Sequence, residues 1–585
     1  MKILPGTLWA AALLATPAWG DVAYRIHIDN PDHHSAQVQA QFPSRAAGTL
    51  EVKLPNWRTG RYQLLPLADG IRGFEALGSD GQPLAWQKTA RATWAIALPK
   101  ATEVTVRYQV HANELKDRSR HIDDTHAYLD ASGVFMYSPQ FRQEPVSVEL
   151  EVPSGWRSVS GMDGDGAHRF VAPDYDVLVD SPIETGIHQD FAFEVDGRQY
   201  ELVIWGEGNY DTELMVNDLK ALVAAGGAYF GSDYPYERYV FMVHATTGVR
   251  GATEHLNSTV IQRPRWSFAK REDYLSFIAT ASHELVHTWN VKAYRPQGLV
   301  PYNYQSDNYT PLLWLAEGGT SYLQNLWLVR AGVMTVEEYL KDLAKRLVRH
   351  GQTPGRELQS VAEASFDNWI ARGGDYGTNH SVSIYSEGFL ANWALDFWLR
   401  DGDSGIEQLH RALYRDHRLP GAYNDDQLKR LVSTLGGRSA EPFWQSHIDG
   451  PLQLDSQALL AQAGLTLTLD EQRKLDLGLT TDGEGGAITR VRRDGPAWQA
   501  GLTAGDQLVA IDGQRWDPKA WEQTLARYQA GQSVTVTVFR RDRLMTRTLE
   551  LAEQPKGPAK IQPLESVTGA QKARFEAWLG VDWPY

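Results

Sequence analysis

The chain has no cysteine among its 585 residues. Disulfide bonds, thiolate zinc sites, iron–sulfur clusters, cysteine nucleophiles and lipid attachment at cysteine are therefore excluded. Any bound metal ion has to be held by histidine, aspartate or glutamate side chains. The lack of cysteine also fits an oxidising compartment, where an unpaired thiol is a liability.

Positive charge and long apolar runs are scarce as well. The 57 lysines and arginines are outnumbered by 72 aspartates and glutamates, which gives a net charge of −15. An acidic surface repels phosphate backbones, so we expect no nucleic-acid partner. Beyond residue 20 no stretch approaches the roughly 20 apolar residues that span a bilayer, so we expect no membrane insertion.

The first 20 residues do contain a short apolar stretch. It covers residues 8–15, follows Lys2, and is followed by the small residues Ala18 and Gly20. This pattern is typical of a cleaved secretory signal, and the prolines at positions 5 and 17 argue against a transmembrane anchor. We predict a signal peptide over residues 1–20 and an exported protein, either periplasmic or secreted.

The rest of the chain predicts several domains, because its length exceeds what one hydrophobic core usually supports. Residues 21–200 alternate polar and apolar side chains between frequent turns, which indicates an antiparallel β domain. Residues 201–455 contain long windows with helical apolar spacing and predict a mainly helical domain. The clearest of these windows are residues 211–230, 272–290, 311–331 and 336–350.

The last part of the chain has another composition. Short strands, glycine turns and one helix over residues 464–552 resemble a bacterial PDZ domain, which is a β/α fold. Residues 553–585 begin with a segment rich in proline, lysine and glycine, so we expect a linker followed by a C-terminal helix.

The strongest chemical signal is His283-Glu284-Leu285-Val286-His287. On a helix, residues four apart lie one above the other, so both histidines can direct a nitrogen at one metal ion while Glu284 lies beside it. The surrounding window has neither proline nor glycine, which favours a helix. We predict one bound Zn²⁺ ion here; the alternative is a pair of structural histidines.

A catalytic zinc ion takes three protein ligands and keeps one position open. Our candidate for the third ligand is Glu317, in Trp314-Leu315-Ala316-Glu317-Gly318. Thr310 can cap this segment and Pro311 can begin its helix, which places Glu317 among apolar neighbours. A carboxylate in such surroundings is costly unless it is paired or metal-bound. The alternative is an exposed helix residue.

Two further segments support this site. Gly251 and Ala252 follow a predicted strand, and their small side chains would let a peptide backbone approach closely. Tyr385 stands at the start of a predicted helix in Ser383-Ile384-Tyr385-Ser386-Glu387-Gly388. Neither segment identifies a function alone.

Taken in order, these motifs resemble the gluzincin zinc aminopeptidases, and most closely the glycyl aminopeptidase family. The four segments are residues 251–255, 283–290, 314–318 and 384–388. The resemblance covers nearly the whole mature chain and extends to the aminopeptidase N family. It implies an N-terminal β domain, a thermolysin-like helical catalytic domain and a PDZ domain.

The resemblance also implies a role for each candidate residue. His283, His287 and Glu317 would bind zinc, Glu284 would be the general base for a zinc-activated water, and Tyr385 would stabilise the oxyanion. Glu254 would hold the free α-amine of the substrate. The remaining substrate-binding candidates are Gly251, Ala252 and His255.

We therefore expect a zinc aminopeptidase that removes N-terminal residues from peptides, with the preference for glycine and alanine implied by the resemblance. A thermolysin-type zinc endopeptidase is the alternative enzyme. A scaffold or chaperone that binds peptides or C-termini through the PDZ domain is the non-catalytic alternative. Glu284 argues against the scaffold, which has no need of a general base between two histidines.

Overall fold

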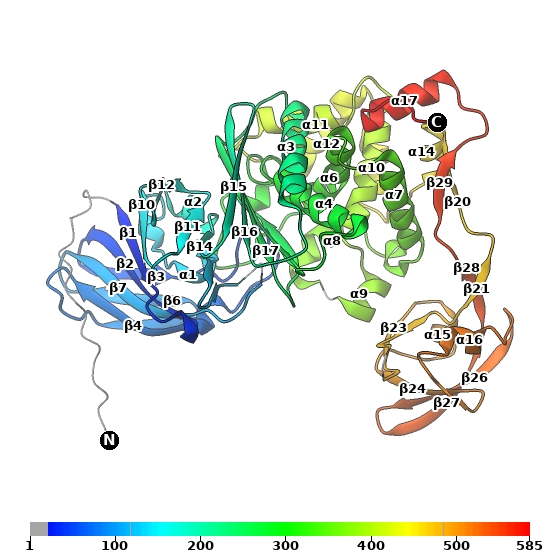
Figure 1. Ribbon diagram of the computed structural model, residues 1–585, viewed down its shortest axis with the longest axis horizontal. Helices are drawn as coiled ribbons and strands as arrows, with labels where there is room; N and C mark the ends of the chain where they lie inside the picture. The colour runs from blue at the N-terminus through cyan, green and yellow to red at the C-terminus, as the bar shows by residue number, and fades with distance from the viewer. Residues whose placement is uncertain (1–20, 117–118, 372, 484) are drawn as a thin grey trace. The chain divides into compact units, whose positions relative to one another are not determined.

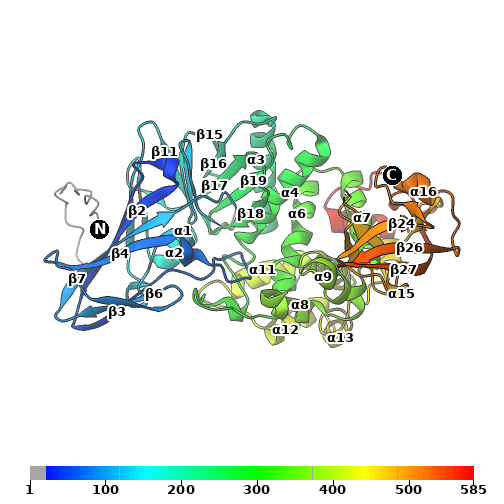
Figure 2. The same ribbon diagram turned by 90° about the horizontal axis from the view of Figure 1, so that it is seen from below.

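A computed structural model describes residues 21–116, 119–371, 373–483 and 485–585. The expected signal peptide, residues 1–20, lies outside the described residues. The chain divides into two compact units, coloured from blue to red along the chain in Figures 1 and 2. The first contains the described residues up to Thr59 and Leu65–Gln189, and the second contains Gly60–Leu64 and Asp190–Tyr585.

The first unit is built of β-sheets. Alternate side chains of its strands are buried, as in Val22, Tyr24 and Ile26 of β1, so the predicted period of two is observed. The largest sheet has the order β12-β13-β10-β1-β2-β7-β4 and is antiparallel except for the β1–β10 pair. Its strands are β12 Asp163–Gly164, β13 Arg169–Ala172, β10 Val146–Glu151, β1 Val22–His27, β2 Ser35–Arg45, β7 Thr102–His111 and β4 Ile71–Gly78.

Two smaller sheets and two short helices complete the first unit's described structure. One sheet contains β3 Gly48–Lys53, β6 Thr93–Leu98 and β5 Trp86–Ala90. The other contains β11 Arg157–Ser160, β14 Ile183–Gly186, β9 His126–Leu129 and β8 His121–Ile122. The helices are α1 Ala131–Val134 and α2 Tyr175–Val179.

The second unit begins with a mixed sheet in the order β15-β16-β17-β19-β18. Strands β16, β17 and β19 run parallel, and β18 is antiparallel to β19 at the edge. Their bounds are β15 Gln189–Val195, β16 Arg198–Trp205, β17 Arg238–Ala245, β19 Ser258–Arg263 and β18 Gly251–Glu254. The strand predicted before Gly251 and Ala252 is thus β17, and these two residues themselves lie in the edge strand β18.

Helices cover this sheet and form the large apolar core of the unit. Helices α3 Thr212–Tyr229 and α4 Arg271–His287 lie beside the sheet (Figure 2). Helix α6 packs against both α4 and α10. The other helices are α5 Leu313–Ala316, α6 Gly318–Arg330, α7 Val336–Gly351, α8 Val361–Phe366, α9 Gly374–His380, α10 Ser386–Arg400, α11 Ile406–Asp416, α12 Asp425–Gly436, α13 Glu441–His447 and α14 Ser456–Gln462. Among the described residues, no helix combines the length and apolar character needed to cross a membrane.

The PDZ-like region has a small core of its own, which includes Leu508, Ile511 and Val536. Its elements are β22 Leu479–Thr481, β23 Ile488–Val491, α15 Pro496–Gln499, β24 Asp506–Ile511, β25 Gln514–Arg515, α16 Trp521–Leu525, β26 Ser533–Arg540 and β27 Arg543–Glu550.

The segment we expected to be a linker contains two strands. β28 Ala552–Pro555 pairs with β21 Arg473–Asp476, and β29 Lys560–Pro563 pairs with β20 Leu465–Thr468. Proline does not prevent this pairing, because each pair forms a two-stranded sheet in which both strands are edge strands, where a missing N–H is tolerated. The C-terminal helix α17 Gly569–Leu579 then buries its apolar side chains in the helical core.

Candidate active site

Helix α4 brings the two histidines of the predicted motif together. Glu272 and Asp273 place negative charge in its first turn, where the helix dipole favours it. The helix extends as far as His287, so His283 and His287, four residues apart, are separated by about one helical turn. As a result, Nε2 of His283 lies 3.0 Å from Nε2 of His287.

Glu317 lies beside both imidazoles. Its Oε2 is 3.6 Å from Nε2 of His283 and 3.3 Å from Nε2 of His287. The helix that we expected from Pro311 begins instead at Leu313, and Glu317 stands at the junction of α5 and α6. Glu317 follows His287 by 30 residues in the sequence. The packing of α6 on α4 therefore brings the three predicted metal ligands together.

The outer nitrogen of each histidine is held by a carbonyl oxygen. Nδ1 of His283 lies 2.8 Å from Oε1 of Gln324, and Nδ1 of His287 lies 3.0 Å from the Asn290 carbonyl oxygen. Because a carbonyl only accepts, each Nδ1 carries the proton in the neutral ring, and each Nε2 presents a lone pair. Two imidazole lone pairs and a carboxylate oxygen thus converge, which is a donor set that fits zinc.

The carboxylates around His287 favour positive charge at this site. Burial lowers the pKa of His287, but Glu317 and Glu254 outweigh burial and raise it to about 9. Burial raises the pKa of Glu317, but the neighbouring histidines hold it well below its ordinary value. The site therefore favours a cation, and a metal ion would displace the His287 proton.

Tyr62 is a site residue that sequence reasoning missed. Its hydroxyl donates to Oε1 of Glu317 at 2.6 Å, and its ring packs edge-on against Trp369 at 6.0 Å between centroids. Burial, with the nearby Glu317 carboxylate, raises the Tyr62 pKa well above its ordinary value, so the hydroxyl stays a donor. No motif identifies this residue, which precedes Glu317 by 255 positions.

Two further carboxylates lie next to His287. Ligand-capable atoms of Glu254, Glu284 and His287 all lie within 4.8 Å of one another. Glu254 is the last residue of the edge strand β18 and is only 4% exposed. In the described part of the chain, its Oε1 has no hydrogen-bond partner. A buried carboxylate oxygen of this kind is costly unless a cation or donor reaches it.

The other predicted substrate-binding residues belong to the same strand and its turn. Gly251 and Ala252 are half-buried, and β18 pairs with β19 as its partner among the described strands. His255 is buried, and its backbone N–H donates to the Ser258 carbonyl oxygen. Strand β18 is thus at the edge of its sheet, the position at which other proteins add an extended peptide as a strand.

Tyr385 lies near the first histidine. It immediately precedes α10, its ring centroid is 6.2 Å from that of His283, and it is 41% exposed. An exposed phenol near the candidate zinc ligands can reach a bound substrate, as the predicted oxyanion role requires.

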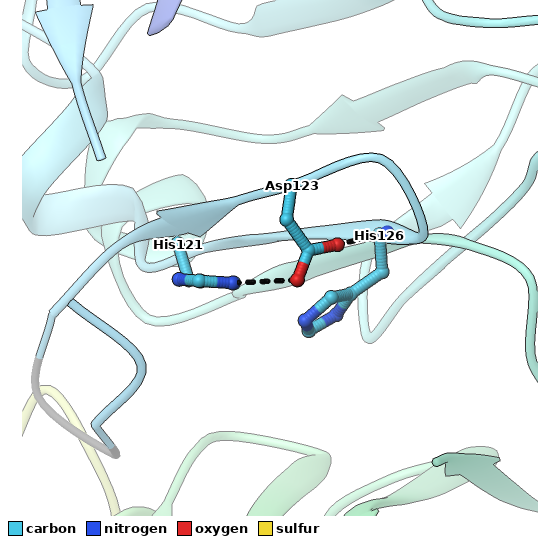
Figure 3. Close-up of side chains that lie close together, drawn as sticks. All are labelled: His121, Asp123 and His126. Atoms are coloured by element: carbon cyan, nitrogen blue, oxygen red, sulfur yellow. Dashed lines mark hydrogen bonds and ion pairs between the residues drawn. The ribbon is translucent and has the colours of Figure 1, made fainter. Parts of the chain in front are cut away.

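The first unit contains a second cluster of ligand-capable side chains, which the sequence reasoning did not identify. Figure 3 shows His121, Asp123 and His126 at the connection between β8 and β9. Asp123 Oδ2 accepts from Nε2 of His121 at 3.0 Å, while Oδ1 accepts from Thr125 and from the His126 N–H. Both carboxylate oxygens thus accept bonds from their own hairpin, and we interpret the cluster as stabilising this turn.

Comparisons with protein families match three parts of the chain. Residues 23–187 match the Peptidase M61 N-terminal domain, residues 276–391 match the M61 glycyl aminopeptidase domain, and residues 487–541 match a PDZ domain. A search of curated proteins finds no match.

The chain is also similar to solved structures. An aminopeptidase N family protein from Idiomarina loihiensis is 26% identical, with a TM-score of 0.88, over 95% of this chain and 100% of the other. An M1 zinc metallopeptidase from Deinococcus radiodurans is 15% identical, with a TM-score of 0.49, over 74% of this chain and 95% of the other. The predicted resemblance to the glycyl aminopeptidase family and the predicted fold class are confirmed, and the family match supports the predicted class of enzyme, an aminopeptidase.

Proposed function

Because the chain carries the N-terminal and catalytic domains of the M61 glycyl aminopeptidases, we propose that it removes small N-terminal residues from peptides at the site around α4. His283, His287 and Glu317 would hold one zinc ion. When bound, the zinc ion would lower the pKa of a water molecule and polarise the carbonyl of the substrate.

The observation that carries the exopeptidase assignment is the environment of Glu254. Its carboxylate is buried beside the candidate zinc ligands, and Oε1 lacks a partner among the described residues. A substrate α-ammonium would supply both the missing hydrogen bond and the compensating charge. An internal peptide nitrogen is neutral and has one N–H at most, so it cannot replace the ammonium group.

Glu284 and Tyr385 would then perform the proton transfer and the charge stabilisation. Glu284 lies next to His287 and Glu254, where it can take a proton from the attacking water and deliver it to the leaving amine. The Tyr385 hydroxyl would donate a hydrogen bond to the substrate oxygen as it gains negative charge.

The preference for glycine is supported by the description of the matching family, and the extension to alanine is part of the proposal. Export, to the periplasm or out of the cell, is supported by the pattern of residues 1–20. N-terminal sequencing of the mature protein recovered outside the cytoplasm should begin near Asp21.

The assignment is tested by comparing glycine and alanine anilides with their N-acetylated forms. We expect acetylation to reduce kcat/KM by 100-fold or more, because it removes the charge that Glu254 binds. A thermolysin-type endopeptidase would cleave both forms at similar rates, and that result would overturn the role of Glu254.

A further inference from the structure

Residues 60–64 come from the part of the chain that forms the first unit, yet they belong to the second. We propose that this segment completes the active site: Tyr62 is a positioning residue for the zinc ligand Glu317, and Gly60 forms the wall beyond the substrate amine. The proposal deepens the proposed aminopeptidase function and rests on it for the role of Gly60.

The position of Tyr62 determines which oxygen of Glu317 is available to a metal ion. Oε1 accepts the Tyr62 hydroxyl at 2.6 Å, whereas Oε2 faces the two imidazoles at 3.3 and 3.6 Å. The carboxylate therefore presents one oxygen to the ion and cannot rotate without losing a buried hydrogen bond. Outer hydrogen bonds of this kind typically change metal affinity by about 10–100-fold.

The position of Gly60 limits the space around Glu254. Gly60 has a φ of +80°, and a methyl group added to it would lie 2.4 Å from Oε2 and 2.7 Å from Oε1 of Glu254. Position 60 thus requires glycine both for its backbone and for its contact with the carboxylate. A peptide chain that continued past an amine bound at Glu254 would meet this backbone, so the segment favours substrates that end there.

The segment is fixed in position at several points. The Leu65 N–H donates to the Asn56 carbonyl oxygen at 2.6 Å, which closes the base of the loop. At the tip, the Tyr62 ring packs edge-on against Trp369, whose Nε1 donates to the Asn308 carbonyl oxygen at 3.1 Å. A loop held at its base and its tip can position two groups at a site.

The Tyr62 part is tested by zinc release, which does not require substrate. Zinc-loaded Tyr62→Phe should lose its ion to an excess of chromogenic chelator about 10-fold faster than the unaltered protein. Tyr274→Phe is the matched control, because it removes a hydroxyl that donates to Asp218, a carboxylate on α3 outside the zinc site, at 2.8 Å. Release from Tyr62→Phe at the rate of this control would overturn the positioning role.

The Gly60 part is tested with an alanine anilide. We expect Gly60→Ala to raise KM about 10-fold and to leave zinc release unchanged, because the added methyl group displaces the Glu254 carboxylate. Gly231→Ala is the matched control, since Gly231 has a similar φ of +70° and no described atom near the added methyl group. Equal KM values for the two variants would overturn the proposed wall.

The zinc-release and anilide tests distinguish a failure of the Tyr62 role from a failure of the aminopeptidase function. If N-acetylated anilides were cleaved as fast as free ones, the aminopeptidase assignment would fail, and the wall at Gly60 would fail with it. Faster zinc release from Tyr62→Phe would still establish Tyr62 as a positioning residue in that case.

Discussion

The candidate zinc site and the hairpin between β8 and β9 contain the same kinds of side chain, two histidines and a carboxylate, but their hydrogen bonds differ. In the hairpin, both oxygens of Asp123 accept bonds from residues of the same turn. At the zinc site, Gln324, Asn290 and Tyr62 occupy the outer atoms of the ligands. The histidine and Glu317 lone pairs at the candidate zinc site therefore point toward one another. In the hairpin, by contrast, the oxygens of Asp123 already accept hydrogen bonds.

The two clusters therefore have the same types of residue close together but different hydrogen bonds. What distinguishes the two clusters is whether hydrogen-bond partners outside the cluster orient its lone pairs toward a common point.

The sharpest test replaces one matched histidine in each cluster. The side chains of His283 and His121 are 13% and 12% exposed, so an alanine at either position removes a similar amount of packing. We expect His283→Ala to lose its zinc and to have no measurable peptidase activity, and His121→Ala to keep both. Metal analysis of the folded variants and the anilide assay measure the outcome; loss of zinc from His121→Ala would contradict the comparison.

Glu284→Gln separates metal binding from catalysis within the zinc site. The amide has almost the same shape as the carboxylate but cannot accept a proton, so kcat should fall by about 10²–10⁴-fold. Zinc content should remain unchanged, because Glu284 is not one of the three predicted ligands. A variant with full activity would require another general base.

Tyr385→Phe should have a smaller effect on the same reaction. Removing one hydrogen-bond donor to a developing oxyanion typically costs about 10²–10³-fold in kcat, and we expect KM to change little. Tyr376→Phe is the control, since Tyr376 is also exposed, at 57%, and its ring stacks on His380. Equal kcat values for the two variants would show that Tyr385 does not stabilise the oxyanion.

Asp123→Asn tests the structural role of the hairpin cluster. The loss of charged hydrogen bonds should destabilise the first unit by about 1 kcal/mol at neutral pH, and calorimetry should show its melting temperature lowered by about 2–4 °C. Asp124→Asn, at the exposed neighbouring position, should melt like the unaltered protein. Activity and zinc content should not change in either variant.

The effect of Asp123→Asn should also depend on pH. Burial raises the Asp123 pKa, but hydrogen bonds from His121 and Thr125 outweigh burial and hold it well below its ordinary value. A lowered pKa in the folded state stabilises the protein above the unfolded value of about 3.9 and loses this effect as the pH falls below it. The difference between the two proteins should therefore shrink below about pH 4; a constant difference would exclude the charge as its cause.

Several parts of the fold could be predicted because they depend on neighbouring residues. Helix α4 lies where the apolar spacing indicated, and β17 is the strand predicted before Gly251. The interrupted helix at Glu317 and the strands β28 and β29 were not predicted. Their conformations depend on partners far along the chain: β20 and β21 for the strands, and α4 for Glu317.

The sequence by itself determined the chemistry of the site. Without cysteine, a metal ion had to be held by imidazole and carboxylate groups, and the spacing of His283 and His287 fixed their alignment through the hydrogen bonds of one helical turn. Only the tertiary structure decided that Glu317 lies beside those histidines and accepts a hydrogen bond from Tyr62. It also decided that Asp123 accepts hydrogen bonds within its own turn. The backbone hydrogen bonds of a helix join residues four positions apart, whereas these contacts depend on how whole helices and loops pack together.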